Sequence, residues 1–131
     1  MVIIQPPQEQ FSGLSYFHNP VVVFDGRDVL LGVAGPGEHD VAMLRFEHAI
    51  TFRTLPVNSE HLSGYKYRVK YFAPNEIIGA DEAKEWEVLD ARFWVIPFND
   101  LLIEIIFFGA VYIDPKRSMG KTLEQLIRAV K

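Results

Sequence analysis

Two stretches of the chain alternate between apolar and polar residues, which is the pattern of half-buried β-strands. From Ala42 to Arg53, every second residue is apolar or histidine, and these residues share one face of the strand. From Tyr65 to Tyr71, tyrosine or valine alternates with lysine or arginine. We therefore predict a strand over each stretch, the first bent near its middle.

Shorter apolar runs predict a hairpin near the N-terminus. Val21–Phe24 and Val29–Val33 flank the turn sequence Asp25–Asp28, which contains a glycine. Two β-branched runs joined in this way are typical of a β-hairpin. We expect loops over residues 35–40 and 55–64, and an irregular segment with room for one helical turn over 73–85.

A second hairpin is predicted later in the chain. Trp86–Pro97 and Leu101–Ile113 are expected to be strands around a tight turn at Asn99 and Asp100. The second of these strands is apolar on both faces. One face can cover the core, and a C-terminal helix can cover only part of the other. The apolar surface left over predicts a homo-oligomer, most simply a dimer.

The C-terminal residues have the spacing of an amphipathic helix over about residues 118–130. Thr122 and Gln125 resemble a capping box at its start. The apolar stripe consists of Met119, Leu123, Leu126, Ile127 and Val130.

These elements predict a single domain over residues 1–131, mainly β (α+β), with about six to eight antiparallel strands and one C-terminal helix. A twisted sheet of this size curls into a β-barrel or splits into a β-sandwich. The pattern leaves both architectures open.

Composition and charge narrow the function classes. The chain has no cysteine, which excludes disulfides, thiolate metal sites and cysteine nucleophiles. Its net charge of −4 argues against general nucleic-acid binding, although residues 116–131 are basic. The N-terminus lacks the pattern of a signal peptide, and Leu101–Ile113 is too short to span a bilayer. We therefore expect a soluble, cytoplasmic protein with no membrane span.

Glu104 is the sharpest candidate for a functional residue, because it is the only charged residue of the predicted strand Leu101–Ile113. A two-residue turn at Asn99–Asp100 would place it opposite Val95, and a three-residue loop opposite Trp94. Burial of a carboxylate without a partner is costly, and functional sites are one place where such a cost is tolerated.

The structural alternative is that Glu104 lies at a strand edge, or that it pairs with Arg45, Arg92 or a strand lysine. Polar groups near it in sequence or in the loop 58–64 extend the candidate site. We take as candidate ligand-binding residues His61, Asn99, Asp100 and Glu104.

Established catalytic and cofactor motifs are not present in the sequence. The four histidines do not have the spacing of metal ligands, and we expect no metal. Gly120–Thr122 resembles the end of a phosphate-binding loop, but Pro115 stands where the first glycine is required. We therefore expect no cofactor.

Over about residues 44–113, the chain resembles a functionally uncharacterised family of small bacterial β-rich proteins. The resemblance rests on the loop Asn58–Tyr65 and on the hairpin Arg92–Asp100 with Glu104 beyond it. Relatives carry histidine at the turn and a Phe-Glu pair after it, where this chain has Asn99 and Ile103. If the family uses that histidine chemically, this chain would be impaired. The resemblance implies no mechanism.

The sequence thus favours a non-enzymatic binding or protein-interaction domain. The alternative is a small-molecule-binding barrel, or a small hydrolytic enzyme, with a pocket near Glu104. An aromatic-lined cavity around Glu104 would favour the alternative, and a solid core would favour interaction.

Overall fold

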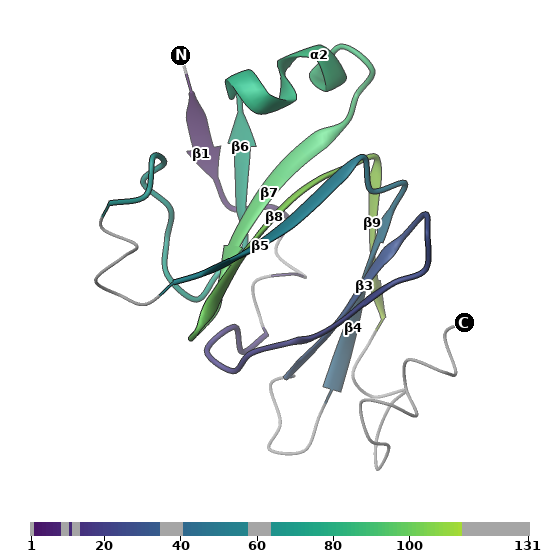
Figure 1. Cartoon of the computed structure of the whole chain (residues 1–131), viewed down its shortest axis with the longest axis vertical. Coiled ribbons are helices and arrows are strands. Elements are labelled where there is room, and N and C mark those ends of the chain that lie inside the picture. Colours follow the sequence, from purple (N-terminus) through teal and green to yellow (C-terminus); the bar gives the residue numbers. More distant parts are fainter. Residues whose placement is uncertain (1, 9–10, 12–13, 35–40, 58–63, 114–131) are drawn as a thin grey trace.

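The computed structural model describes residues 2–8, 11, 14–34, 41–57 and 64–113 (Figure 1). Its strands are β1 (Ile3–Gln5), β2 (Val21–Phe24), β3 (Val29–Ala34), β4 (Val41–Glu47), β5 (Thr51–Pro56), β6 (Asn75–Ile78), β7 (Arg92–Pro97), β8 (Leu101–Phe107) and β9 (Gly109–Ile113). Between β6 and β7 lie a 3-10 turn, η2 (Asp81–Ala83), and a short helix, α2 (Lys84–Glu87). The helix predicted over 118–130 lies outside the described residues.

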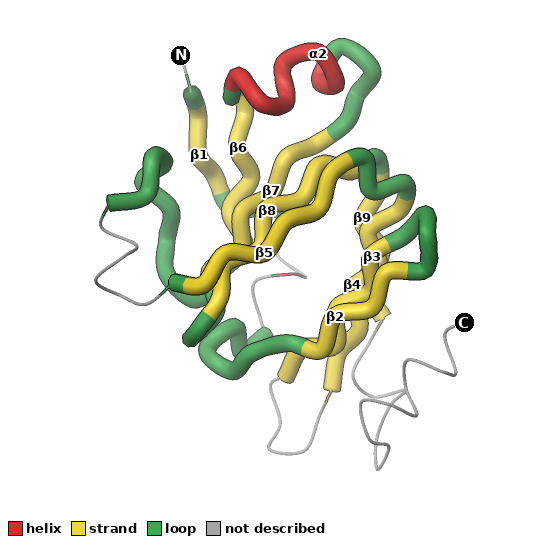
Figure 2. The backbone as a smooth tube through the Cα atoms, in the orientation of Figure 1, coloured by secondary structure: helices red, strands yellow, loops and turns green. Residues whose placement is uncertain are grey.

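The described strands form two antiparallel sheets, which confirms the mainly β class. One sheet has five strands in the order β1-β6-β7-β8-β5, and the other has four in the order β2-β3-β4-β9. Figure 2 shows the two sheets as separate layers that face one another. The arrangement is sandwich-like, and these strands do not close into one barrel.

An aromatic core lies between the two sheets. Trp94 of β7 is fully buried, and the rings of Phe46, Phe107 and Phe11 each meet it edge-on at centroid distances of 5.4, 5.1 and 5.1 Å. Edge-to-face contacts of this kind add to the stabilisation that burial of the rings provides. Both sheets contribute to this core, which also contains Leu31, Val33, Leu44, Ile96, Ile103 and Ile105.

Both long predicted strands are broken where the chain passes from one sheet to the other. The stretch Ala42–Arg53 divides into β4 and β5 at His48, whose φ is 52°. The stretch Leu101–Ile113 divides into β8 and β9 at Phe108, whose amide donates to the carbonyl of Glu47 at 3.0 Å. The alternation continues across the first break and the apolar run across the second, so the pattern could not reveal either change of sheet.

The two predicted hairpins are confirmed. In the first, Phe24 pairs with Val29 across the four-residue turn. In the second, the amide of Phe98 donates to the carbonyl of Leu101 at 2.7 Å, which leaves a two-residue turn. Strands β1 and β6 were not predicted, because β1 is very short and β6 lies in the segment expected to be irregular.

The outer face of the five-stranded sheet is covered by the chain itself. Residues 65–71 pack over it although they form no strand, and Trp86, predicted to begin a strand, lies in α2. The alternation over residues 65–71 still corresponds to burial, since Tyr65, Tyr67 and Val69 turn inward. The apolar face of β8 from which we expected a dimer is therefore largely occupied, and the dimer stays a prediction. Within the described residues, no helix is long and apolar enough to cross a membrane.

Candidate functional site

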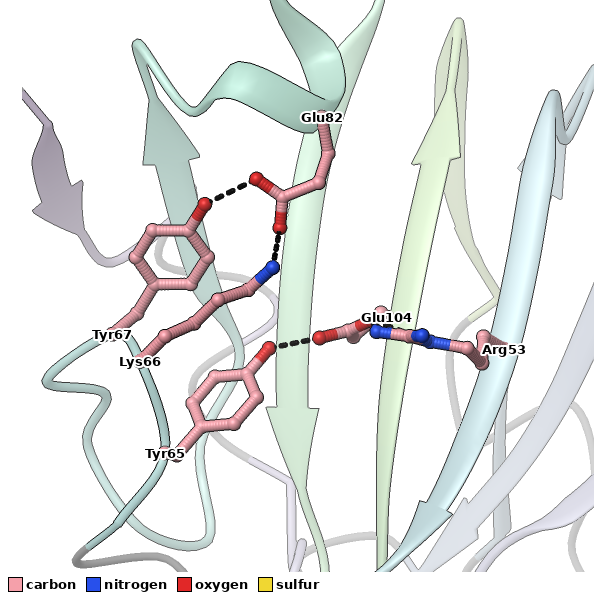
Figure 3. A network of polar contacts seen from close by, with 6 residues as sticks. All are labelled: Arg53, Tyr65, Lys66, Tyr67, Glu82 and Glu104. Atoms are coloured by element: carbon pink, nitrogen blue, oxygen red, sulfur yellow. Dashed lines mark hydrogen bonds and ion pairs between the residues drawn. The ribbon is translucent and has the colours of Figure 1, made fainter.

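Glu104 lies on the outer face of the five-stranded sheet, in the middle of β8. It stands opposite Val95 of β7, as the two-residue turn predicts, and opposite Arg53 of β5 on its other side, and it is only 7% exposed. Arg53 donates to its Oε1 from Nε at 2.8 Å and also from Nη2, while the hydroxyl of Tyr65 donates to its Oε2 (Figure 3). Both oxygens of this buried carboxylate are therefore engaged, which offsets the cost of burying its charge.

Glu82 of η2 repeats this arrangement on the same face. The hydroxyl of Tyr67 donates to its Oε1, and the ammonium group of Lys66 forms an ion pair with its Oε2. Each carboxylate therefore joins one tyrosine to one cation. Figure 3 shows the two groups side by side, with the tyrosines and the lysine reaching over the sheet from one segment.

Local sequence explains how three consecutive residues serve two carboxylates. Tyr65 and Tyr67 point to the same side, with ring centroids 5.9 Å apart, and Tyr67 also meets the buried ring of Phe93 edge-on at 6.2 Å. The tyrosine bodies thus bury apolar surface while their hydroxyls reach polar partners. Above them, the small buried residues Ala80 and Ala83 let η2 approach the sheet and bring Glu82 within reach.

These charged groups border a surface pocket of about 460 Å³. Its volume is within the range of small-molecule sites. Apolar side chains and both ion pairs contribute to its wall, which consists of Thr51, Phe52, Arg53, Lys66, Glu82, Phe93, Glu104 and Ile106. The two cations remain accessible, because the side chains of Arg53 and Lys66 are 58% and 50% exposed.

Four groups of the site, on Arg53, Tyr65, Tyr67 and Glu82, have shifted pKa values. Burial and then the bond to Glu104 raise the pKa of Tyr65, and burial and the bond to Glu82 raise that of Tyr67. Burial opposes the charged form of Glu82, but the bonds from Lys66 and Tyr67 outweigh it and lower its pKa. The bond to Glu104 raises the pKa of Arg53. At neutral pH, the site thus holds two protonated tyrosines, a charged Arg53 and a charged Glu82.

The structure does not bring all predicted site residues together. Asn99 and Asp100 form the exposed turn before β8 and do not line the pocket of Glu104. Asp100 instead has a structural role, because its carboxylate and its amide each bind the side chain of Asn19, at 2.7 and 3.0 Å. His61 lies outside the described residues.

Sequence reasoning missed five residues of the polar network around Glu104: Arg53, Tyr65, Lys66, Tyr67 and Glu82. It named Arg45 and Arg92 as arginine partners of Glu104, but the partner is Arg53. The sequence pattern could have indicated Arg53, because this residue lies on the polar face of the predicted strand Ala42–Arg53. No sequence pattern indicated that η2 would bring Glu82 over the sheet. Among the described residues, no group of three or more acidic or histidine side chains is arranged to hold a metal ion.

The chain matches no protein-family model, and no curated protein or solved structure is significantly similar to it. The pocket and its chemistry therefore have to indicate the function.

Proposed function

We propose that the protein is a non-enzymatic binding protein, and that the pocket beside Glu104 takes a small ligand with an anionic group and an apolar part. The observation that carries this proposal is the pair of accessible cations, Arg53 and Lys66, at a pocket whose wall is partly apolar. Each cation is held in place by a carboxylate that a tyrosine fixes from its other oxygen.

Arg53 is the expected anchor of the anion. A guanidinium has five N–H donors in a planar fork, and Glu104 engages it through Nε and Nη2. Because Glu104 fixes its orientation, little side-chain entropy remains to be lost when an anion binds. The apolar part of the ligand would rest on Phe93 and Ile106, which are buried in the sheet beneath.

The state of the carboxylates favours binding over hydrolysis. A general base must reach the proton that it removes. Both oxygens of Glu104, and both oxygens of Glu82, already accept from a cation and a tyrosine. These carboxylates therefore suit the positioning of cations better than proton transfer.

The experiment is a titration of the ¹⁵N-labelled chain with a panel of aromatic and aliphatic carboxylates and phosphate esters, each matched to its uncharged amide or alcohol. We expect anionic members with an apolar part to shift the amide signals of Arg53, Lys66 and Glu104, and their uncharged counterparts to bind at least about tenfold more weakly. Arg53→Met should abolish this preference.

Arg27→Met is the matched control, because Arg27 is an exposed arginine, 64% accessible, on the other sheet's hairpin turn. It should bind as the unmodified chain does. Equal binding of charged and uncharged members, no binding of any member, or an Arg53→Met variant with unchanged preference would each contradict the proposal.

A further inference from the structure

A second pocket, of about 430 Å³, lies apart from Glu104, between β1 and the turn that precedes β6. Arg68 and Lys70 line it together with Ile4, Pro6 and Phe72. None of its lining residues is acidic, and among the described residues neither Arg68 nor Lys70 takes part in an ion pair. In a chain whose net charge is −4, this is a local concentration of unneutralised positive charge.

The turn that builds this pocket is held by a buried asparagine. Asn75 is 4% exposed, and its side chain accepts from the amide of Lys70 at 2.8 Å and donates to the carbonyls of Lys70, Ala73 and Val95. These bonds fix the turn against β7. They also fix Phe72 in the left-handed region, with a φ of 52°. Such a conformation is unfavourable for a bulky residue and persists only where the surroundings impose it.

The fixed turn presents aromatic rings to solvent. Phe72 is 39% exposed and lies 5.1 Å from the ring of Phe17, which is 51% exposed, and Tyr71 is 41% exposed. Phe17 comes from a segment distant in sequence, so the rings form a shelf that extends beyond the pocket. Exposed rings grouped in this way mark interaction sites more often than isolated apolar side chains do.

We propose that this surface, formed by Arg68, Lys70, Phe72 and Phe17, binds an acidic segment of a partner protein that carries an aromatic or apolar anchor residue. The anchor fills the pocket against Phe72, and neighbouring carboxylates of the segment pair with Arg68 and Lys70. A peptide segment fits better than a compact ligand, because the shelf continues past the pocket toward Phe17. The inference is independent of the ligand proposed for the pocket at Glu104.

The probes are a random copolymer of glutamate and tyrosine, polyglutamate, and a random copolymer of lysine and tyrosine. Each is titrated into the ¹⁵N-labelled full chain and followed by NMR. We expect the glutamate–tyrosine copolymer to shift the amide signals of residues 68–73 and Phe17, polyglutamate to bind more weakly, and the lysine–tyrosine copolymer not to bind. The double variant Arg68→Glu/Lys70→Glu should weaken binding about tenfold or more.

Phe72→Gly separates recognition from folding. Glycine adopts a φ of 52° without strain, so the melting temperature should stay the same or rise, while binding of the copolymer falls. Lys84→Glu, a charge reversal at an exposed lysine of α2, is the matched control and should bind normally.

Three results would overturn the inference: copolymer shifts located elsewhere, charge-reversed and Phe72→Gly variants that bind as the unmodified chain does, or a Phe72→Gly variant with a lowered melting temperature and unchanged binding. Binding to phosphatidylserine vesicles through these residues, without binding to the copolymer, would replace the protein partner by a membrane surface.

Discussion

The five-stranded sheet carries an arginine–glutamate pair on each of its faces, and the two pairs differ in what surrounds them. On the inner face, Arg92 donates to Glu76 from Nε at 2.9 Å and also from Nη2, and the buried indole of Trp94 donates to the same oxygen at 2.9 Å. On the outer face, Glu104 binds Arg53 and Tyr65.

The difference lies in the accessibility of the cation. The side chain of Arg92 is 28% exposed and lies against the ring of Trp94, with 5.5 Å between the guanidinium carbon and the ring centroid. The side chain of Arg53 is 58% exposed and borders a pocket, although its carboxylate partner is the more buried of the two. The same residue types therefore serve the core on one face and present an accessible cation on the other.

The largest expected effect is the loss of the inner carboxylate. Glu76→Leu should lower the free energy of unfolding by about 3 kcal/mol, because it leaves the indole N–H of Trp94 buried without an acceptor and Arg92 without its partner. Urea unfolding followed by tryptophan fluorescence measures this change. Glu76→Gln, which keeps an acceptor oxygen, should cost about 1 kcal/mol. A Leu variant as stable as the unmodified chain would show that the inner pair is not structural.

The second prediction removes the accessible cation of the outer pair. Arg53→Met should destabilise the chain at pH 7, but less than Glu76→Leu does, since Tyr65 still binds Glu104. The deficit should shrink at about 1 M salt, because salt weakens the ion pair that the unmodified chain keeps. Urea unfolding at low and high salt tests this. A deficit that is the same at both would show that the charge pair contributes nothing.

The third prediction concerns Glu104 itself. Glu104→Leu should change the free energy of unfolding by only about 1 kcal/mol in either direction. Arg53 can turn into water, and the apolar side chain gains burial that offsets the hydrogen bond lost by Tyr65. Binding of anionic ligands in the pocket should nevertheless weaken, since Arg53 loses its fixed orientation. A stability loss as large as that of Glu76→Leu would assign both pairs the same structural role.

Much of the fold could be predicted from the sequence because local pairing determines it. The two hairpins have short turns, and the turn at Asn99–Asp100 fixes the register that places Glu104 opposite Val95. The breaks at His48 and Phe108 could not be predicted, since the change of sheet there depends on contacts between distant strands. The same reason applies to β1, which is very short and which, among the described strands, pairs with the distant β6 alone.

The candidate site was predictable at one residue. Glu104 stood out because a lone carboxylate in an apolar strand requires an explanation, and the structure supplies partners for it. Asn99 and Asp100 are near it in sequence but lie in the exposed turn. Lys66 and Glu82 belong to segments that meet only when the chain covers its own sheet, and no local pattern encodes that contact.

The smallest expected effect tests whether the Glu82 group on the outer face is held together by charge. The pKa of Glu82 is lowered although burial alone would raise it, so the folded state favours the charged form and gains stability above the ordinary glutamate range. That stability should be lost as the pH falls from about 5 to about 3. Lys66→Gln removes one cause of the lowered pKa, so this variant should be slightly less stable at pH 7 and should lose less stability on acidification.

Urea unfolding across this range measures the slope of the free energy of unfolding against pH, for the variant and for the unmodified chain. Lys70→Gln is the control, because Lys70 has no ion pair among the described residues. Parallel slopes for Lys66→Gln and the unmodified chain would show that the ion pair with Glu82 adds no stability, and Arg53 would then be the one cation of the pocket held by charge.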